Sequence, residues 1–227
     1  METAKIKEIF ASIQGEGPYV GVKQLFIRFS GCNLNCNFCD TDEEDCRGKF
    51  PDYTPEQLAK HIEQFDLKNI HTVSLTGGEP LLWADFLKEF LPLINNKIYL
   101  ETNSTLNTQI PKIIDMVDII SADIKLPSAS GVEKSFALHD EFFKVLQGYN
   151  KEVFAKIVFD ENILDDEIAH CIKLAEKYKL PLILQPKTQD YELSVSGEKI
   201  IEVFDKFLTK YPNVRVIPQV HKYLQVL

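Results

Sequence analysis

Apolar segments typical of buried β-strands alternate with amphipathic helical patterns along this chain. The segments expected to form strands are Gln24–Ser30, Thr72–Leu75, Lys97–Glu101, Val117–Ala122, Val153–Val158, Leu182–Gln185 and Val214–Ile217. The segments expected to form helices are Pro55–Gln64, Trp83–Asn95, Lys134–Gly148, Asp165–Lys179 and Ser196–Tyr211. Strands that alternate with helices pair in parallel, because each helix carries the chain back to the same end of the sheet. This order therefore predicts an α/β fold with mainly parallel strands.

About six strand–helix units are fewer than the eight that close a (β/α)8 barrel. We therefore expect an open, partial (β/α)6 barrel whose site lies at the carboxyl ends of the strands. No linker rich in Pro, Gly or Ser divides the chain, which indicates a single domain over residues 1–227. The acidic and polar insert at 42–54 is expected to form a loop over the site or a short helical turn.

The composition is that of a globular protein and argues against several functions. Hydrophobic residues make up 44% of the 227 residues and charged residues 26%. The net charge of −9, from 25 basic and 34 acidic residues, argues against a dedicated nucleic-acid-binding protein. No segment approaches the roughly 20 apolar residues of a membrane span, and the first residues lack the apolar core of a signal peptide. We expect a cytoplasmic protein, with no membrane partner, in a reducing compartment.

Three cysteines, Cys32, Cys36 and Cys39, form a C-x3-C-x2-C pattern directly after the first expected strand. Thiolates are the preferred ligands of iron–sulfur clusters and of zinc. Three ligands leave one iron of a four-iron cluster open to a small molecule. The alternative is a zinc site in which Cys46 supplies the fourth ligand. Cys171 belongs to an apolar helical stripe and is expected to be an inert buried thiol.

Polar residues follow three of the expected strands. Thr76–Pro80 contains two glycines, which let the backbone approach a ligand, and Glu79 can accept hydrogen bonds from an ammonium group. The alternative is a tight turn between a strand and a helix. Glu101–Ser104 ends the next strand and could equally be a helix N-cap. Ser121–Pro127 places Ser121, Asp123 and Lys125 at the end of another strand, where the sites of α/β proteins are built.

The cysteine pattern on a loop after the first barrel strand, with these strand-end motifs, resembles the radical S-adenosylmethionine superfamily. The resemblance implies a [4Fe-4S] cluster on Cys32, Cys36 and Cys39, and S-adenosylmethionine as the cofactor. It also implies an electron donor such as flavodoxin or ferredoxin. The residues that would contact S-adenosylmethionine are Phe38, Cys39, Asp40, Gly77, Gly78, Glu79, Glu101, Asn103, Ser121, Asp123 and Lys125.

Further segments are similar to the 7-carboxy-7-deazaguanine synthase family, over nearly the whole chain from Ile9 to Lys222. These segments are Ile9–Gly17, Phe26–Phe29, Cys39–Thr41, Leu184–Gln189 and Arg215–Lys222. The resemblance implies ring contraction of 6-carboxy-5,6,7,8-tetrahydropterin with loss of ammonia, Mg²⁺ bound by Thr41, and a homodimer. Thr41 could equally cap the following segment. The residues implied to contact the pterin are Ile13, Gln14, Gly15, Glu16, Arg28, Thr76, Gln185 and Lys187.

The residue chemistry agrees with a small carboxylated heterocycle. Arg28 can form a bidentate pair with a carboxylate, although a surface salt bridge is the alternative. Gln14 offers a donor and an acceptor, and Glu16 accepts from ring N–H groups unless it is a solvated turn residue. His221 is expected to be structural. Two other functions stay open: a glycyl-radical activating enzyme, which would act on a protein, and a noncatalytic zinc- or cluster-binding adaptor.

Overall fold

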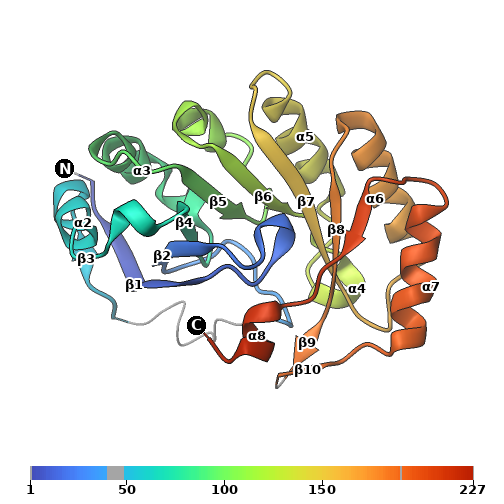
Figure 1. The fold of residues 1–227 in the computed structure, drawn as a ribbon. Helices are drawn as coiled ribbons and strands as arrows, with labels where there is room; N and C mark the ends of the chain where they lie inside the picture. The colour runs from blue at the N-terminus through green and yellow to red at the C-terminus, as the bar shows by residue number, and fades with distance from the viewer. Residues whose placement is uncertain (1, 40–48, 190, 227) are drawn as a thin grey trace.

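A twisted sheet forms the centre of the molecule (Figure 1). The computed structural model describes residues 2–39, 49–189 and 191–226. Within them the main sheet has nine strands in the order β11-β8-β7-β6-β5-β4-β2-β1-β3. Strands β2, β4, β5, β6, β7, β8 and β11 run parallel and do not close into a ring, which confirms the open, mainly parallel α/β barrel. Their bounds are β1 (Ala4–Ile13), β2 (Lys23–Phe29), β3 (Asp52–Tyr53), β4 (Thr72–Gly77), β5 (Ile98–Thr102), β6 (Ile119–Asp123), β7 (Glu152–Phe159), β8 (Leu182–Pro186) and β11 (Val214–Val216).

The longer helices lie along the outer side of the curved sheet (Figure 1). The α-helices are α2 (Pro55–Ile62), α3 (Ala84–Phe90), α4 (Pro127–Ser130), α5 (Phe136–Leu146), α6 (Asp165–Tyr178), α7 (Gly197–Leu208) and α8 (Val220–Leu224). The helix expected at Trp83–Asn95 is shorter, because 3-10 turns at Pro80–Trp83 and Leu91–Leu93 flank α3. Proline at the second position of Leu91–Leu93 cannot donate the hydrogen bond that would continue the α-helix. Between β5 and β6 the chain forms only 3-10 turns, at Ile110–Lys112 and Ile114–Met116.

The start of α2 illustrates how local sequence sets a helix boundary. The Thr54 hydroxyl accepts a hydrogen bond from the Gln57 backbone N–H at 3.3 Å. The Gln57 side chain accepts in return from the Thr54 backbone N–H at 2.9 Å. This reciprocal cap satisfies two backbone donors that a helix start otherwise leaves unpaired, and Pro55 needs none. The helix therefore begins at Pro55, as predicted.

One apolar core fills the space between the sheet and the outer helices. Leu25, Ile27 and Phe29 alternate along β2 and face this core, each at most 1% exposed. Cys171 of α6 is fully buried among these side chains, and burial raises the pKa of its thiol. The prediction of an inert core cysteine is therefore confirmed. Among the described residues, no helix combines the length and the apolar character needed to cross a membrane.

The first strand, β1, was not predicted from the sequence, and it extends the sheet beyond β2 at the open side of the barrel. β1 pairs antiparallel with β2, and a register shift between Ile6 and Glu8 interrupts the period-two pattern that identifies strands. β3, at the end of the insert 42–54, pairs with Ala4 and Lys5 of β1, so this end of the insert is a strand and the expected loop or helical turn is wrong there. An edge strand offers unpaired backbone groups that recruit such a segment.

The β1–β2 loop, residues 14–22, crosses the open side of the sheet toward the C-terminal segment. The Val220 backbone N–H donates to the Gly15 carbonyl at 2.8 Å. A Cβ atom on Gly15 would lie 2.2 Å from Nδ1 of His221, so only glycine permits this close approach. Figure 1 shows the blue β1–β2 hairpin beside the red C-terminal segment that carries α8. The two ends of the chain thus close the side that the strands leave open.

Candidate active site

A cavity of about 610 Å³ opens at the carboxyl ends of the parallel strands. This volume lies in the usual range of small-molecule sites. Most of the predicted site residues line the cavity, namely Ile13, Gln14, Gly15, Glu16, Arg28, Cys32, Cys36, Phe38, Cys39, Thr76, Gly77, Gly78, Glu101, Asn103, Asp123, Lys125, Gln185 and Lys187. Glu79 and Ser121 are not part of this lining. Asp40, Thr41 and Cys46 lie outside the described residues, so their predicted roles stay predictions.

The start of the cysteine loop, residues 31–39, is held by backbone hydrogen bonds from Gly78 and Glu79, which follow β4. The Gly78 N–H donates to the Phe29 carbonyl at 3.0 Å, and the Glu79 N–H donates to the Gly31 carbonyl at 2.8 Å. A Cβ atom on Gly78 would lie 1.9 Å from the Gly31 carbonyl oxygen. Gly77 has φ of +118°, which side chains other than hydrogen rarely tolerate. The two glycines therefore bring the backbone of β4 against the start of the cysteine loop.

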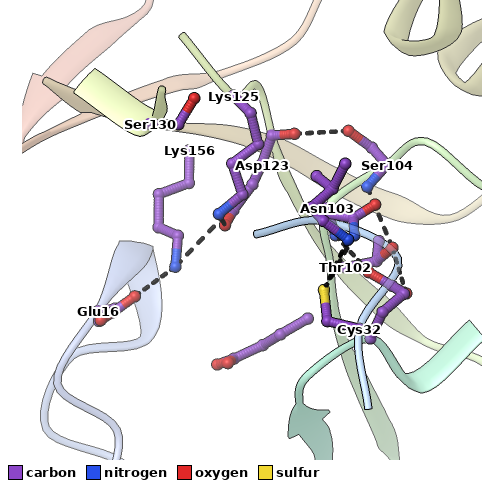
Figure 2. Close-up of polar contacts among 12 residues, drawn as sticks. Glu16, Cys32, Thr102, Asn103, Ser104, Asp123, Lys125, Ser130 and Lys156 are labelled. Carbon is purple, nitrogen blue, oxygen red and sulfur yellow. Dashed lines mark hydrogen bonds and ion pairs between the residues drawn. The ribbon is translucent and has the colours of Figure 1, made fainter. Parts of the chain in front are cut away.

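Asparagine side chains fix the other side of the same loop. Asn103 Nδ2 donates to Asn33 Oδ1 at 2.8 Å and lies 3.7 Å from the Cys32 sulfur (Figure 2). Asn33 Nδ2 donates in turn to Thr105 Oγ1 at 2.9 Å. Burial raises the pKa of the Cys32 thiol to about 11 and also raises that of Cys36. Metal binding would release these protons, since the thiolate is the ligand.

Glu79 is completely buried behind the cavity and joins the ends of β4 and β5. Its carboxylate accepts from Thr102 Oγ1 at 2.8 Å and from the backbone N–H groups of Asn103 and Leu81 at 2.7 and 3.0 Å. Burial raises the pKa of Glu79 to about 7, although these hydrogen bonds lower it in part. In this structure the side chain supports the wall of the cavity, and its contact with S-adenosylmethionine stays a prediction.

Ser121 also lies below the cavity. Alternation along β6 puts Ser121 and Asp123 on the same face, with Asp123 at the strand end and Ser121 one layer deeper. Ser121 is 2% exposed, and its side chain hydrogen-bonds Tyr99. Its predicted cofactor contact stays a prediction.

Four charged side chains form a row across the cavity, which we call the ion row: Lys125, Asp123, Lys156 and Glu16 (Figure 2). Lys125 Nζ lies 2.6 Å from Asp123 Oδ2, and Lys156 Nζ lies 3.4 Å from Asp123 Oδ1. Lys156 also pairs with Glu16 Oε2, and all four side chains are at most 16% exposed. The register of β6 with β7 places Asp123 opposite Lys156.

Mutual attraction keeps the ion row charged. Burial alone would raise the pKa of Glu16, but Lys156 and Gln219 hold that pKa at about 2. Burial likewise opposes the charge of Lys156, yet Asp123 and Glu16 raise its pKa well above the usual value. A buried charge is tolerated only when it is paired and hydrogen-bonded. At neutral pH Glu16 is therefore a carboxylate, and Lys125 and Lys156 are ammonium groups.

Neutral and weakly paired groups complete the wall of the cavity. Gln14 Nε2 donates to Gln24 Oε1 at 2.9 Å and to Glu101 Oε1 at 3.0 Å. The other Glu101 oxygen accepts from the Thr76 hydroxyl at 2.7 Å. Arg28 Nε lies 2.9 Å from Glu8 Oε2, but its N–H is not aligned for a hydrogen bond. The contact of Arg28 with Glu8 is therefore ionic.

Two buried oxygens at the cavity have no protein partner among the described residues. They are Gln185 Oε1 and Thr188 Oγ1, on residues 3% and 7% exposed. Buried polar atoms normally find a hydrogen-bond partner in a protein, in water or in a ligand. Both oxygens can accept from N–H groups of a ligand.

Sequence reasoning missed several lining residues, above all Lys156, Gln219 and Thr188. Lys156 interrupts an apolar strand pattern, and a lysine at an inward-facing position of a buried strand was the available signal. Gln219 Nε2 donates to Glu16 Oε1 at 2.7 Å, a contact between residues 203 positions apart. His221 lines the cavity as well, packed against Gly15.

The donor set fits the predicted cluster. Three of the four cysteines that the structure describes open on this one cavity, and the fourth is the buried Cys171. Within the described ranges, no three His, Cys, Asp or Glu side chains lie close enough together to hold a single metal ion. Three thiols on one loop, beside a cavity with room for a ligand, match a cluster that keeps one iron free of protein ligands.

Comparison with known proteins gives the same assignment. Residues 26–175 match the family model of the radical SAM superfamily. The chain is 36% identical to the 7-carboxy-7-deazaguanine synthase of Geobacter sulfurreducens over 97% of each chain, and 36% identical to that of Archaeoglobus fulgidus over 98% and 99%. The crystal structure of QueE from Escherichia coli superposes with a TM-score of 0.65 at 19% identity, covering 96% of this chain and 95% of that one. The chain therefore belongs to the radical S-adenosylmethionine superfamily and, within it, to the 7-carboxy-7-deazaguanine synthase family.

Proposed function

We propose that this chain converts 6-carboxy-5,6,7,8-tetrahydropterin to 7-carboxy-7-deazaguanine and ammonia, as a carbon–nitrogen lyase on the route to 7-deazapurines such as queuosine. The observation that carries the proposal is the cavity itself, in which three open cysteines face a wall of paired charges and hydrogen-bonding groups. The 36% sequence identity to two synthases, over nearly the full length of this chain, supports the same substrate.

Cys32, Cys36 and Cys39 would hold a [4Fe-4S] cluster, and the cavity beside them would hold S-adenosylmethionine. When bound, these groups supply one-electron cleavage of S-adenosylmethionine and thereby a radical able to abstract hydrogen from the substrate. The protein contributes a fixed loop and a backbone that Gly77 and Gly78 open to close approach. The amide of Asn103, beside the Cys32 sulfur, keeps the loop in place.

The opposite wall of the cavity suits the pterin. Glu16, kept anionic by Lys156, would accept from ring and amino N–H groups, and Gln185 Oε1 would accept another. Arg28 would exchange its ionic contact with Glu8 for a bidentate pair with the substrate carboxylate. Because Arg28 on β2, Gln185 on β8 and Glu16 on the β1–β2 loop approach the cavity from different elements, binding would orient the ring toward the cysteine loop and exclude water from the reacting atoms.

The metal and partner predictions belong to the same proposal. Mg²⁺ would bind the Thr41 hydroxyl together with oxygens of the substrate and water, since a hard cation prefers oxygen ligands. Replacement T41A should weaken stimulation of turnover by Mg²⁺ and leave the iron content intact. Unchanged stimulation would remove Thr41 from the metal site.

We also propose a cytoplasmic homodimer reduced by flavodoxin or ferredoxin. Sedimentation equilibrium tests the dimer.

The test of the proposed function is a product assay under anaerobic conditions. Reconstituted protein is mixed with dithionite, S-adenosylmethionine, Mg²⁺ and the carboxytetrahydropterin, and products are separated by chromatography and mass spectrometry. We expect the deazaguanine and 5′-deoxyadenosine, and neither from C36A, which lacks one cluster ligand. Formation of 5′-deoxyadenosine without the deazaguanine would refute the substrate and favour an activating enzyme. One equivalent of zinc without iron would refute the radical chemistry.

A further inference from the structure

Lys156 occupies the middle of the ion row and contacts both of its carboxylates. It pairs with Glu16 on one side and lies 3.4 Å from Asp123 on the other. Its side chain is 9% exposed, so little water shares in solvating the ammonium group. A lysine in such surroundings is costly to bury, and its removal would leave two carboxylates short of a partner.

The ion row connects two parts of the site that are far apart in the sequence. At one end Lys125 lies over the Phe38 ring of the cysteine loop, with Nζ 5.2 Å from the ring centroid. At the other end Glu16 belongs to the β1–β2 loop and accepts from Gln219 of the C-terminal segment. Figure 2 shows Lys156 reaching from its strand toward Glu16 between these two ends.

Lys156 bridges the carboxylates of Glu16 and Asp123. The β1–β2 loop is otherwise joined to the C-terminal segment, through Gly15 and Val220, and to the neighbouring strands through Gln14. Those contacts fix the loop backbone but not the direction of the Glu16 carboxylate. The direction of that carboxylate therefore depends on Lys156 and Gln219.

We infer that Lys156 is a positioning residue, which aims the Glu16 carboxylate at the substrate and ties it through Asp123 and Lys125 to the cysteine loop. This inference rests on the proposed function. A pterin held by Glu16 would keep a fixed relation to the cofactor side of the cavity. Without Lys156 the pterin binds more weakly, and its ring is no longer held at the correct position relative to the group that abstracts hydrogen. Cleavage of S-adenosylmethionine then becomes uncoupled from product formation.

The experiment compares the wild type with K156M, which keeps the length of the side chain and removes its charge, and with K156R, which restores the charge. K177M is the matched control, since Lys177 forms an exposed ion pair with Asp140 on the outer surface. Three quantities are measured in each protein: iron per chain, the Kd of the unreactive analogue 6-carboxypterin by anaerobic calorimetry without S-adenosylmethionine, and the ratio of deazaguanine to 5′-deoxyadenosine.

For K156M we expect a normal iron content, a Kd raised about tenfold, as for the loss of one charge-assisted hydrogen bond, and a markedly lower product ratio. K156R should recover part of both, and K177M should match the wild type. A wild-type Kd and product ratio in folded K156M would overturn the inference while the proposed function stands. If the wild type makes no deazaguanine, the proposed function fails instead, and an unchanged Kd in K156M would overturn the inference as well.

If K156M does not fold, the inference is tested in a variant that lacks the charges of both Lys156 and Glu16. The double variant E16Q/K156M leaves Asp123 paired with Lys125 and restores a neutral row. We expect it to fold with normal iron content but to bind 6-carboxypterin no better than E16Q alone. If restoring stability in this way also restored wild-type affinity, Lys156 would have only a structural role and the inference would be wrong.

Discussion

The cysteine-loop side of the cavity and the side formed by the β1–β2 loop differ in the charge of the groups that hold them. Backbone amides and neutral side chains fix the cysteine loop, through Gly78, Asn103 and Asn33. Ionised side chains hold the opposite side, through Glu16, Lys156 and Arg28. Neutral hydrogen bonds between short groups tolerate little displacement, whereas ion pairs can exchange partners when a charged ligand arrives.

The difference agrees with the task proposed for each side. Preorganised ligands favour the binding of a cluster, so a rigid neutral frame suits the cysteine loop. A carboxylated pterin brings its own charge, and Arg28 can leave Glu8 to meet it. The ion row offers no such exchange, because both of its carboxylates are already satisfied by lysines. The charged side therefore combines a fixed part, the row, with an adaptable part, the Arg28–Glu8 pair.

The replacement G78A should break the neutral side most severely. The new Cβ atom would lie 1.9 Å from the Gly31 carbonyl oxygen, so the cysteine loop must move away from β4. We expect a loss of about 3 kcal/mol in the free energy of unfolding, at the upper end for overpacking, and loss of most of the iron. Urea unfolding of the metal-free protein and iron analysis measure the two effects.

A matched control for this change is G148A, at the end of α5. A Cβ atom there would meet nothing closer than the Val145 carbonyl oxygen at 3.8 Å. Its iron content and stability should stay near the wild type. If G78A also kept its iron and its stability, the close backbone contact between Gly78 and the cysteine loop would not be required for cluster assembly.

His139 supports the turn after β6 from below and gives a prediction on pH. The ring is fully buried, and its Nε2 accepts from the Lys125 backbone N–H at 3.2 Å. The other nitrogen, Nδ1, therefore carries the proton and faces Ser104 Oγ at 2.9 Å. Ser104 in turn donates to the Asp123 carbonyl at 2.6 Å. A neutral histidine thus holds the turn from which Asp123 and Lys125 enter the ion row.

The variant H139L should lose about 2 kcal/mol of stability at pH 7, because it leaves buried donors without a partner. Burial lowers the pKa of His139 from 6.5 to about 4, so the unfolded chain binds a proton first as the pH falls. The stabilisation by His139 is complete above pH 6.5 and is lost between pH 6.5 and 4, by about 3 kcal/mol. The advantage of the wild type over H139L should therefore shrink over this window and change sign before pH 4.

Urea unfolding at pH 7 and pH 5 measures this difference, with H71L at an exposed histidine as the control. A difference that stays constant with pH would mean that His139 is not held neutral in the native state. Because H139L removes no charged group at neutral pH, its effect should also be insensitive to salt. This insensitivity would distinguish the neutral support by His139 from the ion pairs of the charged side.

Features encoded by a short stretch of sequence were accessible without a structure. The strand predicted at Thr72–Leu75 follows from an apolar run, and it is β4, which continues to Gly77. The turn signal of Gly77 and Gly78 likewise lies at the end of this strand, as expected. The cysteine loop is likewise defined by its own spacing. In such cases neighbours along the chain set the conformation, so pattern and propensity are sufficient.

Features that depend on pairing between distant segments were not accessible. The register between β6 and β7 brings Lys156 to Asp123, and no local pattern of β7 indicates that partner. A register shift hid β1, because it breaks the alternation that marks a strand. Glu79 likewise accepts hydrogen bonds from Thr102 and from the Asn103 backbone N–H, 23 and 24 positions away, and its residue type does not indicate these partners.

The pair of Arg28 with Glu8 gives the smallest expected effect and tests the adaptable part of the charged side. The Glu8 side chain is 43% exposed, so its contact with Arg28 should contribute under about 1 kcal/mol of stability. The variant E8Q frees the guanidinium for a ligand carboxylate. We expect its affinity for 6-carboxypterin to rise roughly twofold to fivefold, with stability nearly unchanged.

Calorimetry with 6-carboxypterin and with pterin, which lacks the carboxylate, makes this test specific. The gain in affinity should appear only for the carboxylated compound, since only that compound competes with Glu8 for Arg28. R28K, which keeps the charge but not the planar fork, should bind 6-carboxypterin more weakly than the wild type. An equal gain for both compounds in E8Q would place the ligand carboxylate elsewhere in the cavity, away from Arg28.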